Sequence, residues 1–156
     1  MEKSSARHSS EPGLGARPKD DPIELALSQV GDRWTFMILR EAFFGVRRFD
    51  EMLRNTKASP SILTGRLKRM VADGLLDRHP YCERPPRYEY VLTAKGKALY
   101  PAIVLLMKWS DDWVAQNAEP TISLIHTVCG HELHPVLKCD KCGKPIAAED
   151  IDWRVG

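Results

Sequence analysis

The sequence lacks any long apolar run. Its longest apolar segments, residues 34–39 and 102–107, fall far short of the roughly 18 residues that a membrane-spanning helix needs. Residues 1–20 also lack the apolar segment of a secretory signal and are rich in Ser, Gly, Pro and charge, so we expect a disordered tail there. These absences exclude a membrane or exported protein and favour the cytoplasm.

The sequence also lacks the motifs of common enzymes. It has no nucleophile elbow, no phosphate-binding loop and no open three-residue metal site, so we do not expect an enzyme. There are only four cysteines, and in a reducing compartment they favour metal or redox chemistry over structural disulfides. A length of 156 residues, with 43% apolar and 28% charged residues, fits one globular domain with a small appendage.

The net charge of +2 is small, but the positive charge is concentrated in one segment. Residues 47–97 contain twelve Lys or Arg against six Asp or Glu, which gives this third of the chain a net charge of +6. A locally basic segment in a nearly neutral protein indicates a surface for a polyanion, although an ordinary solvated surface is the alternative.

Apolar periodicity and capping residues predict four short helices, at 22–30, 34–44, 48–55 and from Ser59 to Asp73. In the first helix we expect the apolar side chains to face inward: Ile23, Leu25, Ala26, Leu27 and Val30. In the fourth, the expected core face is Leu63, Leu67, Met70 and Gly74, with Val71 beside it.

A β-hairpin and a long helix are predicted next. Residues 75–81 and 87–93 read as two strands, joined by the proline-rich stretch CERPP. Thr93 then caps a helix from Ala94 to about Asn117, which Pro101 should bend. This helix has two apolar stripes, so it needs two partners, and we expect one of them to be a second copy of the chain. The stripes are Leu99, Ile103, Leu106, Ser110 and Trp113, and Tyr100, Val104, Met107 and Val114.

The order of elements predicts a mainly α fold with a small β-hairpin wing. It is that of a winged helix-turn-helix domain, followed by a long dimerisation helix. A small C-terminal zinc ribbon is expected in addition, from the spacing of histidine and cysteine described below. We divide the chain into a tail (1–20), a DNA-binding and dimerisation domain (21–118), a zinc-ribbon-like module (119–147) and a C-terminal tail (148–156).

The outer face of the helix that begins at Ser59 is small and basic, and no acidic residue occurs between Ser59 and Ala72. The second helix of a helix-turn-helix lies in the major groove of DNA, where such a face can approach base edges. We expect base contacts from this face and phosphate contacts from its flanks and from the wing. The candidate DNA-binding residues are Ser61, Thr64, Gly65, Arg66, Lys68 and Arg69 on the helix, Arg84 and Arg87 on the wing, and Arg47 and Arg48.

The C-terminal segment repeats one pattern, in which two metal-ligand residues three positions apart are followed by glycine. The copies are His126-x-x-Cys129-Gly130 and Cys139-x-x-Cys142-Gly143, and the nine residues between them leave room for a small hairpin. A Cys3His set suits tetrahedral, structural zinc. His131 and His134 are rivals of His126 for the fourth position, and a free, redox-active CxxC is the alternative to a metal site.

Several stretches resemble HxlR-type transcriptional regulators, which are relatives of the MarR-like winged-helix proteins. They are residues 22–53, SPSILTGRLKRMVADGLLDR, PPRYEYVLTAKGKAL and the WSDDW of residues 109–113. The resemblance implies a homodimer that binds a near-palindromic operator, with the recognition helix at 59–73 and the wing at 81–87. Similar C-terminal tails occur in a subset of such proteins.

One position departs from the family pattern. Many members carry a cysteine, in some a redox sensor, where this sequence has Asp21, so a thiol switch there is excluded. Cys82 in the wing remains as a candidate, with an inert strand residue as the alternative. A small-molecule effector is possible, although Trp34, Phe36, Met107 and Trp109 are better explained as core. The alternative function is a zinc-ribbon interaction module whose winged domain binds a protein.

Overall fold

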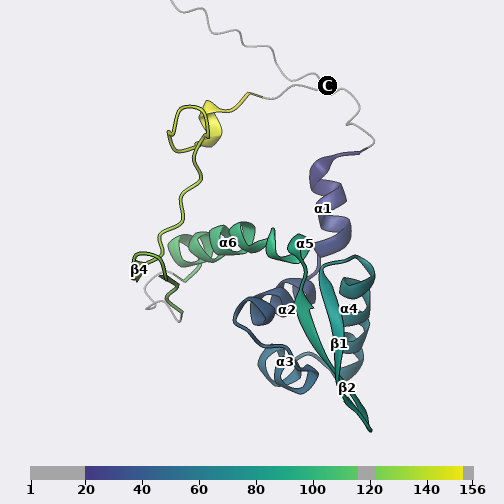
Figure 1. Ribbon diagram of the computed structural model, residues 1–156. Coiled ribbons are helices and arrows are strands. Elements are labelled where there is room, and N and C mark those ends of the chain that lie inside the picture. The colour runs from purple at the N-terminus through teal and green to yellow at the C-terminus, as the bar shows by residue number, and fades with distance from the viewer. Residues whose placement is uncertain (1–19, 116–121, 153–156) are drawn as a thin grey trace, which may run out of the picture.

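The computed structural model describes residues 20–115 and 122–152 (Figure 1). The predicted N-terminal tail up to residue 19, the predicted helix end near residue 117 and residues 153–156 of the predicted C-terminal tail therefore lie outside the described residues. The elements run in the order α1 (Pro22–Val30), α2 (Arg33–Phe43), α3 (Phe49–Thr56), α4 (Pro60–Ala72), β1 (Leu76–Glu83), β2 (Pro86–Leu92), α5 (Ala94–Lys97), α6 (Tyr100–Trp113), β3 (Ile125–His126), β4 (His131–Glu132) and η1 (Ala148–Asp150).

Capping residues set the starts of the helices as predicted. The Asp32 carboxylate accepts hydrogen bonds from the N–H groups of Trp34 and Thr35 at 2.9 and 3.1 Å. The Ser59 hydroxyl accepts one from the N–H of Ile62 at 3.3 Å, and Pro60 follows in the first turn. These bonds satisfy N–H groups that have no partner within the helix, which explains why short polar residues mark these starts.

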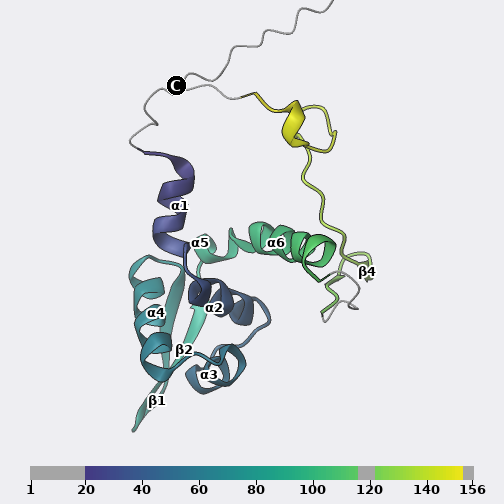
Figure 2. The same cartoon turned by 180° about the vertical axis from the view of Figure 1, so that it is seen from behind.

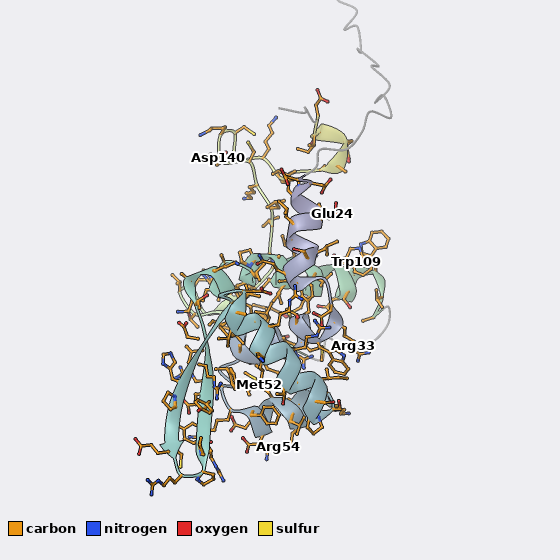
Figure 3. All side chains as sticks on the ribbon, turned by 90° about the vertical axis from the view of Figure 1, so that its right-hand side faces the viewer. Glu24, Arg33, Met52, Arg54, Trp109 and Asp140 are labelled. Atoms are coloured by element: carbon orange, nitrogen blue, oxygen red, sulfur yellow. The ribbon has the colours of Figure 1, made fainter. Side chains whose placement is uncertain are left out.

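The core lies where α2, α3, α4 and the hairpin meet. Met52 of α3 lies inside this cluster, as Figure 3 shows. The predicted inner face of α4 is confirmed, because Leu63, Leu67 and Met70 are buried. Gly74, which we had placed on the same face, instead follows the helix with a φ of +70°, a conformation that favours glycine.

The hairpin forms an antiparallel wing. Leu76 pairs with Leu92 at its base and Glu83 with Pro86 near its tip, with an irregularity between Pro80 and Cys82. The strands reach further than predicted, so the connection CERPP shrinks to Arg84 and Pro85 outside the ladder. Backbone pairing thus continues through residues whose side chains gave no strand pattern.

The inward face predicted for α1 is wrong for most of its residues. Ile23, Leu25 and Leu27 are 68%, 56% and 55% exposed, and only Val30 joins the core. The reason is tertiary, since α1 projects from the domain and reaches the core only by its C-terminal end (Figure 1). The apolar pattern therefore identified the helix but not the surface that would cover it.

The single long helix predicted from Ala94 is also wrong. The chain forms the short α5 and then α6, which begins at Tyr100, with Pro101 in its first turn. Proline has no N–H to bond the carbonyl four residues earlier, whereas in a first turn this donor is not needed. Pro101 thus starts a new helix rather than bending an existing one.

The C-terminal segment forms two small turns. The β3–β4 pair lies beside the end of α6 and flanks the turn at 127–130, and a bridge between Lys138 and Pro145 flanks the second turn (Figure 2). The hairpins thus surround the two ligand pairs, whereas we had placed a hairpin between the pairs. Across residues 20–115 and 122–152, no helix is both long and apolar enough to cross a membrane.

Candidate nucleic-acid interface

The outer face of α4 is open to solvent. Ser61, Thr64, Gly65 and Lys68 are all exposed on the side opposite the buried leucines. A β-carbon added at Gly65 would meet no atom within 4 Å, so packing within the chain does not require glycine there. The helix therefore presents a surface of small and basic residues that a flat or grooved partner can approach closely.

The wing and α4 together form a groove. Thr64 of α4 and Arg87 of β2 line the same hollow, of about 450 Å³. Its other walls are Phe49, Asp50, Tyr81, Pro86, Tyr88 and Tyr90. The three tyrosines and Asp50 were not predicted from the sequence as lining residues. Tyr88 and Tyr90 are two positions apart in β2 and so lie on one face of the strand, but this spacing does not show that α3 and α4 oppose that face.

Two arginines of α4 have partners within the chain. Arg66 forms an ion pair with the Asp32 cap at 3.3 Å, and Arg69 pairs with Asp73 at 3.4 Å and donates to the Ser28 carbonyl at 3.3 Å. These contacts link α4 to the start of α2 and the end of α1. Because exposed ion pairs contribute little free energy, either guanidinium could exchange its partner for a phosphate.

The remaining candidate arginines differ in their surroundings. Arg84, Arg87 and Arg47 are exposed, with Arg84 at the wing tip. Arg48 instead bonds Glu89 at 3.3 Å and lies over the Tyr81 ring, 4.7 Å from its centroid. The hydrogen bond to Glu89, followed by Tyr81, raises the pKa of the Arg48 guanidinium. Arg48 thus holds the wing against the start of α3.

The residues considered for an effector pocket do not gather at one site. Met107 lines a hollow between α6 and the C-terminal hairpin, and Trp34 lines another beside α4 with Ile62 and Gly65. Phe36 packs against the core, and Trp109 is 54% exposed.

The cysteines fall into three places. Cys82 lies half-buried in β1, with its thiol 3.7 Å from the Arg84 carbonyl. The His126 Nδ1 and Cys129 Sγ atoms are 3.4 Å apart, while the Cys139 and Cys142 turn lies away from them (Figures 1 and 2). Backbone hydrogen bonds from Cys142 and then Lys141 lower the pKa of the Cys139 thiol. Within the described ranges, no three His, Cys, Asp or Glu side chains meet as a metal site.

Comparison with known proteins supports the arrangement of the domain. The family model described as HxlR-like helix-turn-helix matches residues 29–118. An HTH-type transcriptional regulator of Mycobacterium tuberculosis (strain ATCC 25618 / H37Rv) is 44% identical over 138 residues, covering 88% of this chain and 87% of the relative.

Solved structures show the same fold. The crystal structure of PA1607, named as a transcription factor, is 31% identical with a TM-score of 0.78, covering 87% of this chain and 95% of that one. The redox regulator HypR in its oxidized form is 30% identical with a TM-score of 0.55, covering 59% of this chain and 96% of that one. The exposed α4 face, the wing beside it and these matches agree, and the chain belongs to the HxlR-like helix-turn-helix family of DNA-binding transcriptional regulators.

Proposed function

We propose that the protein is a dimeric repressor that reads a near-palindromic operator. The observation that supports this proposal is that the basic surface and the exposed apolar surface lie on different parts of the domain. The small, basic face of α4 borders the groove shared with the wing, whereas most of the exposed apolar side chains of the winged domain lie on α1 and α6, with Phe44, Ile62 and Tyr81 as the exceptions. In Figure 1, α1 projects at the end of the domain opposite the wing tip. DNA and a second subunit would therefore occupy different sides of the molecule.

The proposed DNA-binding surface has two parts, one on α4 and one on the wing. Ser61, Thr64 and Lys68 would contact base edges from α4, and the open space at Gly65 would let the helix backbone approach the groove. Arg84 and Arg87 would contact the minor groove or phosphates from the wing, and Arg47 a phosphate. Arg66, Arg69 and Arg48 would assist only after giving up their present partners.

The proposed dimer interface is the exposed apolar stripe of α6. Leu106, Trp109 and Trp113 are 50%, 54% and 68% exposed and share one face at helical spacing. Trp109 stands clear of the domain in Figure 3. The C-terminal hairpin faces the other side of α6, where the two share a hollow lined by Val104 and Asp111, so it leaves the stripe free for a second copy.

The function is tested by binding to DNA from upstream of the protein's own gene and its divergent neighbour. Fluorescence anisotropy near physiological salt with excess random competitor should show specific binding. Thr64→Ala with Lys68→Ala should weaken it at least about tenfold, because each good base contact discriminates by about 1–3 kcal/mol. The matched variant Thr127→Ala with Lys144→Ala should bind as the original chain does.

Other outcomes would be informative. Binding that never exceeds that of random DNA would reject the operator reader and favour a protein partner for the winged domain. For the repressor, deletion of the gene should raise transcription from the bound promoter, and a fall instead would indicate an activator.

A further inference from the structure

The two ligand pairs of the C-terminal segment have the same backbone geometry. We call residues 126–130 the first knuckle and residues 139–143 the second. In the first, the Gly130 N–H donates to the His126 carbonyl at 2.8 Å, and in the second the Gly143 N–H donates to the Cys139 carbonyl at 2.8 Å. The two glycines have φ values of +73° and +70°. His126 therefore occupies in its knuckle the place that Cys139 occupies in the other.

The side chains of the first knuckle already converge. His126 Nδ1 lies 3.4 Å from Cys129 Sγ, and this turn bends the chain so that residues three apart face one point. Cys129 and Cys142 are exposed, and both cysteines of the second knuckle are free thiols. The rival histidines are placed differently in this geometry: His131 is on β4, where it pairs with His126 and follows the turn that holds Cys129, and His134 lines the hollow against α6.

This segment has no core of its own. None of the described residues from 122 to 152 is buried, and its apolar side chains Val128 and Val136 are 86% and 65% exposed. So short a segment cannot offset its conformational entropy by apolar burial, so another source of free energy is needed to fold it. Metal binding supplies such free energy in small domains of this kind.

We propose that His126, Cys129, Cys139 and Cys142 bind one zinc ion, and that the metal draws the two knuckles into one folded unit. The ligands are the soft sulfurs and imidazole that tetrahedral zinc prefers, and four of them leave no open position for catalysis. Nine residues separate Cys129 from Cys139, which extended would span about 30 Å, enough for the second knuckle to fold back on the first.

The hydrogen bonds indicate where the chain would turn. The Leu133 N–H bonds the Leu124 carbonyl at 2.7 Å beside the first knuckle, and the Ile146 N–H bonds the Leu137 carbonyl at 3.0 Å beside the second. A change confined to residues 134–136 would therefore bring the knuckles together with both pairings intact. Because the first knuckle's hairpin contacts α6, the closed unit would form against that helix.

The test uses the full chain, stripped of metal by a chelator under reducing conditions and titrated with Co²⁺ and then Zn²⁺. We expect one metal per chain and the charge-transfer absorption of cobalt bound by thiolates. His126→Ala, Cys129→Ser and Cys142→Ser should lose zinc to a chelator that leaves the original chain loaded. The matched variants His131→Ala, His134→Ala and Cys82→Ser should retain it.

Folding of the segment is measured separately. Zinc should slow hydrogen exchange in residues 122–147 and leave residues 33–92 unchanged, which also shows that each variant keeps its winged domain. The proposal is overturned by no tight binding, by one metal per two chains that depends only on Cys139 and Cys142, or by a site that survives His126→Ala but not His134→Ala. None of these measurements involves DNA, so failure of the zinc proposal would not contradict the proposed repressor function.

Discussion

At the scale of single residues, Gly65 is expected to lower the stability of α4 while allowing the helix to approach DNA closely. A glycine inside a helix costs about 1 kcal/mol relative to alanine, and at this position an added β-carbon would touch nothing. Packing within the described chain therefore gives no reason for a glycine at this position. Close approach of the helix backbone to DNA would provide that reason.

The substitution Gly65→Ala should therefore act in opposite directions on two measurements. The free energy of unfolding, from urea denaturation, should rise by up to about 1 kcal/mol because helix propensity improves without a clash. Operator affinity should fall, because the methyl group would lie between backbone and DNA. The control is Ala72→Gly near the end of the same helix, which should lower stability. Unchanged affinity for Gly65→Ala would remove this position from the DNA interface.

At the scale of elements, capping residues in the sequence predicted where helices start, but the sequence did not predict which surfaces pack against each other. Asp32, Ser59 and Thr93 cap helices through bonds to residues two or three positions away, so the sequence alone indicated them. The exposure of Ile23 in α1 depends on where that helix projects, and periodicity carries no information on that. The basic face of α4 was predictable because it depends only on helical spacing. The ion-pair partners of Arg66 and Arg69 within the chain were not predictable, because they depend on how α4 packs against α1 and α2.

The wing tip should contribute to affinity through phosphate charge. Replacing Arg84 and Arg87 by alanine should weaken binding to all sequences and make the slope of log affinity against log salt less steep, by about 1 for each phosphate that is no longer neutralised. Anisotropy titrations at several salt concentrations measure this slope. Lys108→Ala, which removes a cation paired with Asp112 on α6, should leave it unchanged. An unaltered slope in the wing variant would mean that its arginines do not contact phosphates.

At the scale of the whole molecule, α6 has three faces with different surroundings. Its buried Ile103 joins the core, Val104 and Met107 line the hollow that α6 shares with the C-terminal hairpin, and its exposed stripe faces solvent. A subunit pairing through this stripe would fix the distance between two copies of α4. Operator spacing would then depend on a helix that touches no DNA, and a ligand or modification that moved α6 would change affinity.

Disrupting the stripe should therefore reduce both assembly and operator binding. We expect Leu106→Asp with Trp109→Asp to shift the sedimenting species at micromolar concentration from two chains to one, because burying two carboxylates opposes association. Operator affinity should fall with it, since a single α4 reads only half of a palindrome, while circular dichroism keeps its helical signal. Val136→Asp, which adds a carboxylate at a residue that is 65% exposed outside this stripe, is the control and should remain dimeric. If the original chain itself sediments as a monomer, the dimeric mechanism is wrong, and each winged domain would have to bind DNA alone.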